Sequence, residues 1–144
     1  MMLLEKECTL RKAQLPVVYK VVVRMFDGRR WSAIDHNCPV EYRYRQKSRS
    51  HSEPLFAFEE FGQAVRFRDD EDRNNWRKSG TLEIWRARAE NPRRQYSVLL
   101  VPDPTLVIDF WRTGGGNAPD SFEVGDAPAG TVVCDSICLT SRVA

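Results

Sequence analysis

Arginine and aromatic residues alternate in the first third of the chain, a pattern that could bind a polyanion. Arg29-Arg30-Trp31 is one such run, and Tyr42-Arg43-Tyr44-Arg45 is a second. A sheet that presents rings for base stacking and guanidinium groups for phosphates can hold a nucleic-acid single strand. On a strand, however, the tyrosines and the arginines of the second run point to opposite faces. Single-strand binding is therefore kept as an alternative, and its candidate residues are Arg29, Arg30, Trp31, Arg43 and Arg45.

The histidines and cysteines do not have the spacing of a metal site. His36 and Cys38 lie close in sequence, and Cys134 and Cys138 lie four residues apart. Because the latter two fall on a predicted strand, their Cα atoms would be about 13 Å apart at ~3.3 Å per residue. That separation is too long for both sulfurs to bind one zinc ion. We predict no metal and no cofactor, and we interpret the cysteines as reduced thiols that pack as small apolar side chains.

Sequence motifs for nucleophilic catalysis, phosphate binding and calcium binding are absent. No G-x-S-x-G elbow occurs. Gly114-Gly115-Gly116 lacks the G-K-[ST] ending of a phosphate loop, which favours a hinge. The acidic run Asp69–Asp72 is flanked by arginines and has no spaced calcium-ligand pattern, so it indicates a neutralised surface turn. Whether the protein is an enzyme is left open.

The composition is that of a globular domain. Hydrophobic residues make up 42% and charged residues 29%, and both values are ordinary for a folded chain. No apolar run approaches the ~20 residues of a membrane helix, and no secretory signal follows Met1. We expect a cytoplasmic protein without membrane contact. Its 144 residues fit one domain, which we place over residues 15–144 after an arm or short helix over 1–14.

Charge is distributed unevenly along the chain. Residues 1–50 carry 11 basic and 5 acidic side chains, a balance of +6, whereas residues 96–144 carry 2 and 6, a balance of −4. Either the basic third faces the acidic third within the fold, or it forms a binding surface. Arginine suits the second role because its planar group makes bidentate contacts with phosphate or carboxylate.

Strand patterns dominate the chain. Val17–Met25 is rich in β-branched residues, and Asp27-Gly28 is a favoured pair for a hairpin turn into a returning strand over Arg29–Ile34. Strict alternation indicates a half-buried strand over Val40–Gln46. Further strands are predicted over Thr81–Ala89, Tyr96–Val101, Thr105–Arg112 and Thr131–Thr140.

One helix is predicted over Glu59–Arg68, after the short apolar run Leu55–Phe58, because Phe58, Phe61, Ala64 and Val65 fall on one helical face. Asp69–Gly80 is interpreted as a loop or a frayed helix extension. Lys47–Pro54 and the glycine-rich Thr113–Gly130 are interpreted as loops, and the role of the second is left open. About seven strands and one helix predict an α+β fold, a mainly antiparallel curved sheet with the helix packed on one face.

Four short segments carry a resemblance to known proteins: Tyr19–Val22, Leu55–Phe58, Glu83–Trp85 and Gly130–Ile137. The layout resembles a loose group of small uncharacterised proteins, which implies a compact domain and no mechanism. It is more remotely similar to the ADP-ribosyltransferase type of fold. That family usually carries Gln/Glu-x-Glu in its catalytic region, and here Glu83 and Glu123 each stand alone. The resemblance implies NAD-dependent ADP-ribosyl transfer as an alternative, with Tyr19, Arg24 and Glu83 as the residues to test.

The leading hypothesis is a non-enzymatic binding or protein-interaction domain. No catalytic constellation accompanies the arginine-rich first third. The partner would be another protein or a second copy of the chain, since exposed strand edges can pair between copies.

Overall fold

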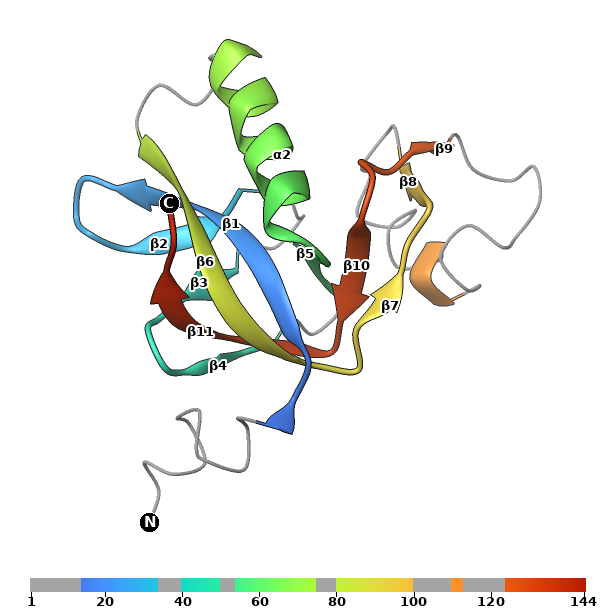
Figure 1. The fold of residues 1–144 in the computed structure, drawn as a ribbon, viewed down its shortest axis with the longest axis horizontal. Helices are drawn as coiled ribbons and strands as arrows, with labels where there is room; N and C mark the ends of the chain where they lie inside the picture. The colour runs from blue at the N-terminus through green and yellow to red at the C-terminus, as the bar shows by residue number, and fades with distance from the viewer. Residues whose placement is uncertain (1–13, 34–39, 50–53, 75–79, 100–109, 113–123) are drawn as a thin grey trace.

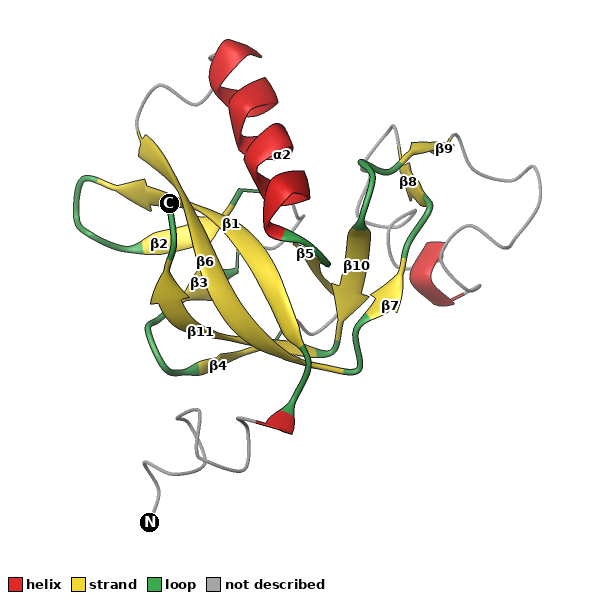
Figure 2. Ribbon diagram, in the orientation of Figure 1, coloured by secondary structure: helices red, strands yellow, loops and turns green. Residues whose placement is uncertain are grey.

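The computed structural model describes residues 14–33, 40–49, 54–74, 80–99, 110–112 and 124–144 (Figure 1). Within these ranges the fold is mostly antiparallel sheet with one main helix (Figure 2), as expected for the α+β class. The main sheet has nine strands in the order β4-β11-β6-β1-β5-β10-β7, with β2 paired to β1 and β3 paired to β2. Its strands are β1 Val17–Met25, β2 Arg30–Ser32, β3 Glu41–Tyr42, β4 Lys47–Ser48, β5 Leu55–Phe58, β6 Gly80–Glu90, β7 Arg93–Arg94, β10 Thr131–Cys134 and β11 Ser136–Arg142. No helix in the described ranges is long and apolar enough to cross a membrane.

Strand β1 organises the sheet. It pairs with β6 along its whole length, from Val17 opposite Arg88 to Met25 opposite Gly80. Its other edge is shared, because β5 pairs with it at Tyr19 and β2 pairs with it from Val22 onward. The two partners leave that edge in different directions, and the sheet curves around a common interior (Figure 1).

The β1–β2 turn confirms the predicted hairpin. The Gly28 amide donates to the Met25 carbonyl at 2.9 Å, and the Asp27 carboxylate accepts from the Arg29 amide at 2.9 Å. Gly28 has a φ of 82°, a left-handed conformation that glycine adopts without steric cost. This turn leaves Phe26 at the tip of the hairpin, 93% exposed.

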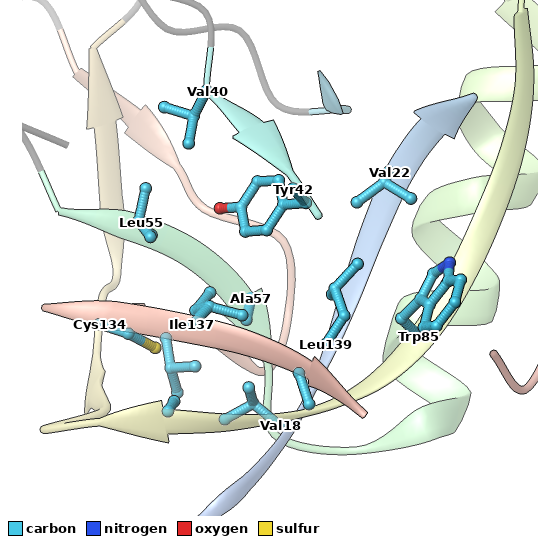
Figure 3. Packing of buried hydrophobic residues seen from close by; sticks show 13 residues of the cluster. Val18, Val22, Val40, Tyr42, Leu55, Ala57, Trp85, Cys134, Ile137 and Leu139 are labelled. Carbon is cyan, nitrogen blue, oxygen red and sulfur yellow. The ribbon is translucent and has the colours of Figure 1, made fainter. Parts of the chain in front are cut away.

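Two buried clusters lie on the two faces of the sheet. The larger one fills the concave interior with side chains from six strands, and Figure 3 shows Val22, Tyr42, Leu55, Trp85 and Leu139 among its members. The smaller one lies beneath α2 (Phe61–Asn74), where Ala64 of the helix packs with Val21, Phe58 and Ile84. Alternation along β1 and β6 supplies both clusters, because successive side chains of a strand point to opposite faces.

Some predicted strands are shorter than expected or are broken, as Arg29–Ile34 is a strand only over Arg30–Ser32. Only Glu41–Tyr42 of the predicted strand Val40–Gln46 is extended, because the chain turns at Tyr44 and Arg45. Arg45 has a φ of 60°, which no strand residue adopts. The chain then forms β4 at Lys47–Ser48, inside a predicted loop. The predicted strand Thr131–Thr140 is broken at Asp135 into β10, which pairs with β5, and β11, which pairs with β6, and the Asp135 amide donates to the Glu90 carbonyl at the end of β6.

Other boundaries also differ from the prediction. Helix α2 starts at Phe61 and continues to Asn74, so the acidic run from Asp69 lies on the helix and not on a turn. Residues 110–112 are helical and not strand. A two-stranded sheet outside the main one pairs β8 (Ser97–Leu99) with β9 (Val124–Asp126), inside the predicted glycine-rich loop. Short strands such as β7 and β9 form by pairing with strands that are distant in sequence, so no local pattern predicts them.

The cysteines depart in part from the expectation of reduced thiols. Cys134 is a free, buried thiol, but Cys138 is disulfide-bonded. His36, Cys38 and Gly114–Gly116 lie outside the described residues, as does the predicted N-terminal segment up to residue 13.

Candidate functional site

A buried carboxylate lies at one end of the concave interior. Glu83, on β6, has no exposed surface. Its Oε1 accepts hydrogen bonds from Arg30 Nε at 2.7 Å and from the Trp85 indole Nε1 at 3.0 Å. Its Oε2 accepts no hydrogen bond, but Arg142 Nη1 lies 3.1 Å from it and Arg24 Nε lies 3.6 Å from it. We call Arg24, Arg30, Glu83 and Arg142 the Glu83 cluster.

The Glu83 cluster has more positive than negative charge. Three guanidinium groups share one carboxylate, which leaves a formal surplus of +3 − 1 = +2. Side chains of Arg24 and Arg142 are 45% and 47% exposed, and that of Arg30 is 24% exposed. Each guanidinium has five N–H donors, so three partly exposed groups keep donors that Glu83 does not use. The cluster can therefore bind an anionic group from solvent.

The pKa of Glu83 lies below its ordinary value of 4.5. Burial alone would raise it, since a charge is costly to remove from water. The hydrogen bonds from Arg30 and Trp85 and the charges of Arg30 and Arg142 outweigh burial. Glu83 is thus ionised near neutral pH and serves as a counter-ion to the arginines.

Strand register brings the cluster together from four strands. Arg24 of β1 stands opposite Arg30 of β2, and Arg142 of β11 stands opposite Trp85 of β6. Glu83 lies two residues from Trp85, so both side chains leave β6 on the same face. The arginines of β1, β2 and β11 therefore converge on β6 from both sides.

Aromatic residues stiffen this end of the interior. Trp85 is only 6% exposed, and its ring centroid lies 4.9 Å from the Arg30 guanidinium and 5.7 Å from the Tyr44 ring centroid. Arg45 in turn lies 5.6 Å from the Tyr44 centroid. Guanidinium groups over ring faces are held by cation–π attraction. Trp85 therefore helps to orient Arg30, and Tyr44 helps to orient Arg45.

The predicted binding residues fall into two groups and one outlier. Arg24, Arg30 and Glu83 meet in the Glu83 cluster, with Arg45 at its margin. Arg29, Trp31 and Arg43 lie on the other side of the β2–β3 ribbon, where Glu41 contacts Arg29 at 3.2 Å and Arg43 at 3.6 Å. The Arg29 guanidinium lies 5.5 Å from the Trp31 ring centroid.

Tyr19 is the outlier. Its ring packs edge-on against Phe61 of α2, with centroids 5.8 Å apart, and it belongs to the cluster beneath the helix. Because Tyr19 and Glu83 lie on opposite faces of the sheet, the structure does not bring them together.

A buried lysine, Lys20, adds a further polar group to the interior. Lys20 of β1 has no exposed surface, and its Nζ donates to Ser32 Oγ at 2.9 Å and to the Phe56 carbonyl at 2.5 Å. The Tyr42 ring centroid lies 5.1 Å from Nζ. Burial, and to a lesser extent Cys134, raises the pKa of the Tyr42 hydroxyl well above its ordinary value. This hydroxyl has no hydrogen-bond partner.

Sequence reasoning missed Lys20 and Arg142 as members of this polar interior. Lys20 interrupts an apolar strand, which is a local signal that could have found it. Arg142 lies beyond the predicted end of the last strand, and the register shift between Leu139 and Ser141 changes which face it reaches. Alternation alone could not have placed it.

Comparisons with protein-family models, with curated proteins and with solved structures found no match. The similarity to the ADP-ribosyltransferase type of fold therefore stays a prediction. Function must be argued from the site itself.

Proposed function

We propose that the protein is a non-enzymatic interaction domain that binds an acidic segment of a protein partner through the Glu83 cluster. The observation that supports this is the surplus of two positive charges on partly exposed guanidinium groups around one buried carboxylate. A carboxylate from a partner would complete the pairing, and the planar arginine fork matches it bidentately.

The hairpin next to the cluster supplies an apolar contact. Phe26 is 93% exposed at the tip of the turn between Arg24 and Arg29. Aromatic and arginine side chains are the residues that most often dominate protein interfaces. A partner that fits this surface has a small apolar socket rimmed by acidic residues.

A protein segment fits the surface better than a nucleic acid does. Trp85 is 6% exposed and Tyr42 is 2% exposed, so neither ring is free for base stacking, and the half-exposed Tyr44 ring already packs against Trp85 and Arg45. The Arg29–Trp31 stack on the other side of the ribbon is the feature that supports single-strand binding. ADP-ribosyl transfer remains the other alternative, and an NAD titration by calorimetry that shows no heat would remove it.

The direct test compares labelled hexaglutamate with labelled oligothymidylate by fluorescence anisotropy at low salt. We expect saturable peptide binding that weakens as salt rises, because the contact is electrostatic. Arg24→Gln and Arg142→Gln should each weaken it. The matched control is Arg86→Gln, on the same sheet but with its exposed side chain on the opposite face of β6 from Trp85.

Three outcomes would overturn the proposal. Tighter binding of the oligonucleotide would favour the nucleic-acid alternative. Equal losses in Arg86→Gln and Arg24→Gln would mean that net charge alone acts. Absence of saturation with either probe would remove the anion-binding role. Sedimentation of the protein alone identifies the partner as a second copy if mass rises with concentration.

A further inference from the structure

A cavity of about 360 Å³ lies away from the Glu83 cluster, between the start of α2, strands β7 and β10, and the β8–β9 ribbon. This volume lies within the range of small-ligand pockets, about 300–1,000 Å³. Its lining includes Glu59, Gln63, Arg94, Tyr96, Asp126 and Gly130. The charges and rings of these residues indicate what it would accept.

The floor of the cavity is fixed by packing. Gln63 Oε1 accepts the Glu60 amide hydrogen at 3.1 Å, and the rest of its side chain lies against Gly130. A Cβ at Gly130 would overlap the Gln63 amide, and the φ of 79° at this position also favours glycine. The Gly130 carbonyl accepts from the Glu59 amide at 3.0 Å, which ties the turn to the start of the helix.

Among the described residues, one charge in the lining, that of Asp126, has no partner. Arg94 is neutralised by Glu59 through a two-point contact of 3.1 and 3.3 Å. Hydrogen bonds to Glu59 and to Tyr96 raise the pKa of Arg94, so this guanidinium keeps its charge. Asp126 is exposed and makes no ion pair or side-chain hydrogen bond with any described residue. The cavity therefore presents a single negative charge.

An exposed aromatic residue also lines the cavity, and its side chain hydrogen-bonds Arg94. Tyr96 is 71% exposed, and its carbonyl accepts from the Ala127 amide at 2.9 Å, so its backbone lies across the β8–β9 ribbon from the residue that follows Asp126. A carboxylate and a ring face together suit a cation, since the ring quadrupole attracts positive charge.

We infer that this cavity binds an alkyl ammonium or guanidinium group, with Asp126 as its counter-ion and the Tyr96 ring against its alkyl stem. Gln63 and the Arg94–Glu59 pair line the rest of the site. The same chemistry occurs in a free polyamine-like molecule and in a lysine or arginine side chain of a protein. The inference does not depend on the proposed function, because the two sites share no residue.

The test is an NMR titration of the ¹⁵N-labelled protein. Agmatine and 1,5-diaminopentane represent free amines, and acetyl-lysine-methylamide and acetyl-arginine-methylamide represent protein side chains. We expect saturable amide shifts at Tyr96, Asp126, Ala127 and Gly130. Tighter binding of the first pair identifies a small-molecule ligand, and tighter binding of the second pair identifies a protein side chain.

Asp126→Asn should weaken binding by about tenfold, equivalent to about 1.4 kcal/mol. The matched control is Asp27→Asn, which removes the same charge from the distant β1–β2 turn and should change nothing. Unchanged affinity in Asp126→Asn would overturn the inference. So would larger shifts at these amides with acetate than with any amine, or no saturable shift with any probe. Each of these results leaves the hexaglutamate test untouched.

Discussion

Replacing Glu83 by glutamine tests whether the Glu83 cluster stabilises the fold. The substitution keeps the size of the side chain and an oxygen that Arg30 and Trp85 can still bond. It removes the one negative charge among three arginines. The arginines would then repel one another without a counter-ion.

The magnitude follows from the geometry. A hydrogen bond to a charged group contributes about 1.5–3 kcal/mol and a neutral one about 0.5–1.5 kcal/mol, so the Trp85 bond, which becomes neutral, loses about 1 kcal/mol. The Arg30 bond keeps its charged donor. The contacts with Arg24 and Arg142, both nearly half exposed, contribute about 0–1 kcal/mol each. We expect Glu83→Gln to lower the free energy of unfolding by about 1–3 kcal/mol.

The assay is urea unfolding followed by circular dichroism at neutral pH. Glu41→Gln is the matched control, because Glu41 also contacts two arginines but from the surface of the ribbon, where its side chain is 20% exposed. Its loss should stay below about 1 kcal/mol. Equal stability of Glu83→Gln and the unchanged protein would refute the reasoning about the cluster.

The pH dependence gives a second check on the same variant. The pKa of Glu83 is lower in the folded protein than its ordinary value of 4.5. A lowered carboxyl pKa stabilises the fold above the unfolded pKa, and this stabilisation is lost as pH falls through the folded pKa. The stability difference between the two proteins should therefore shrink as pH falls below 4.5. A difference that stays constant down to the acid transition would contradict the assignment of that charge.

Three further predictions concern single buried or strained positions. Burial raises the pKa of the Cys134 thiol to about 12, so iodoacetamide at about pH 8 should label Cys134 only after unfolding, as read by peptide mass spectrometry. Tyr42→Phe removes a buried hydroxyl that has no hydrogen-bond partner among the described residues. It should leave the free energy of unfolding unchanged or raise it by about 1 kcal/mol. A clearly lower melting temperature would show that the hydroxyl is bonded. Gly130→Ala should lower the melting temperature more than Gly28→Ala does. Both positions have positive φ, but only Gly130 lies against Gln63. Equal decreases in melting temperature would mean that the overlap with Gln63 has no energetic cost.

The strands with strong local patterns were predictable from the sequence. Val17–Met25 has the predicted bounds, because β-branched residues mark the strand itself and the Asp27-Gly28 turn pair marks its end. Thr81–Ala89 also forms, as Gly80–Glu90. In the second strand, alternation predicts Leu82 and Ile84 on one face and Trp85 and Ala87 on the other, and the two buried clusters confirm this division. The α+β class follows from these elements and from the helix at Phe61.

The parts that failed depend on contacts between distant residues. The break at Asp135 is held by the Glu90 carbonyl, 45 residues away in sequence (135 − 90 = 45). For the site, alternation along β6 places Glu83 on the face of Trp85, but only the strand register brings Arg30 and Arg142 to it. The +6 balance of the first fifty residues indicated a basic surface without showing which arginines converge.

The bonding of Glu83 supports a binding role over proton transfer for this cluster. A general acid or base must exchange a proton with its substrate, so it needs a free oxygen within reach and a pKa near the working pH. Oε1 already accepts two hydrogen bonds, Oε2 is buried, and the lowered pKa keeps the group ionised. The arginines cannot give up their protons near neutral pH. The cluster exposes N–H donors and positive charge to solvent, and an anion-binding site needs both.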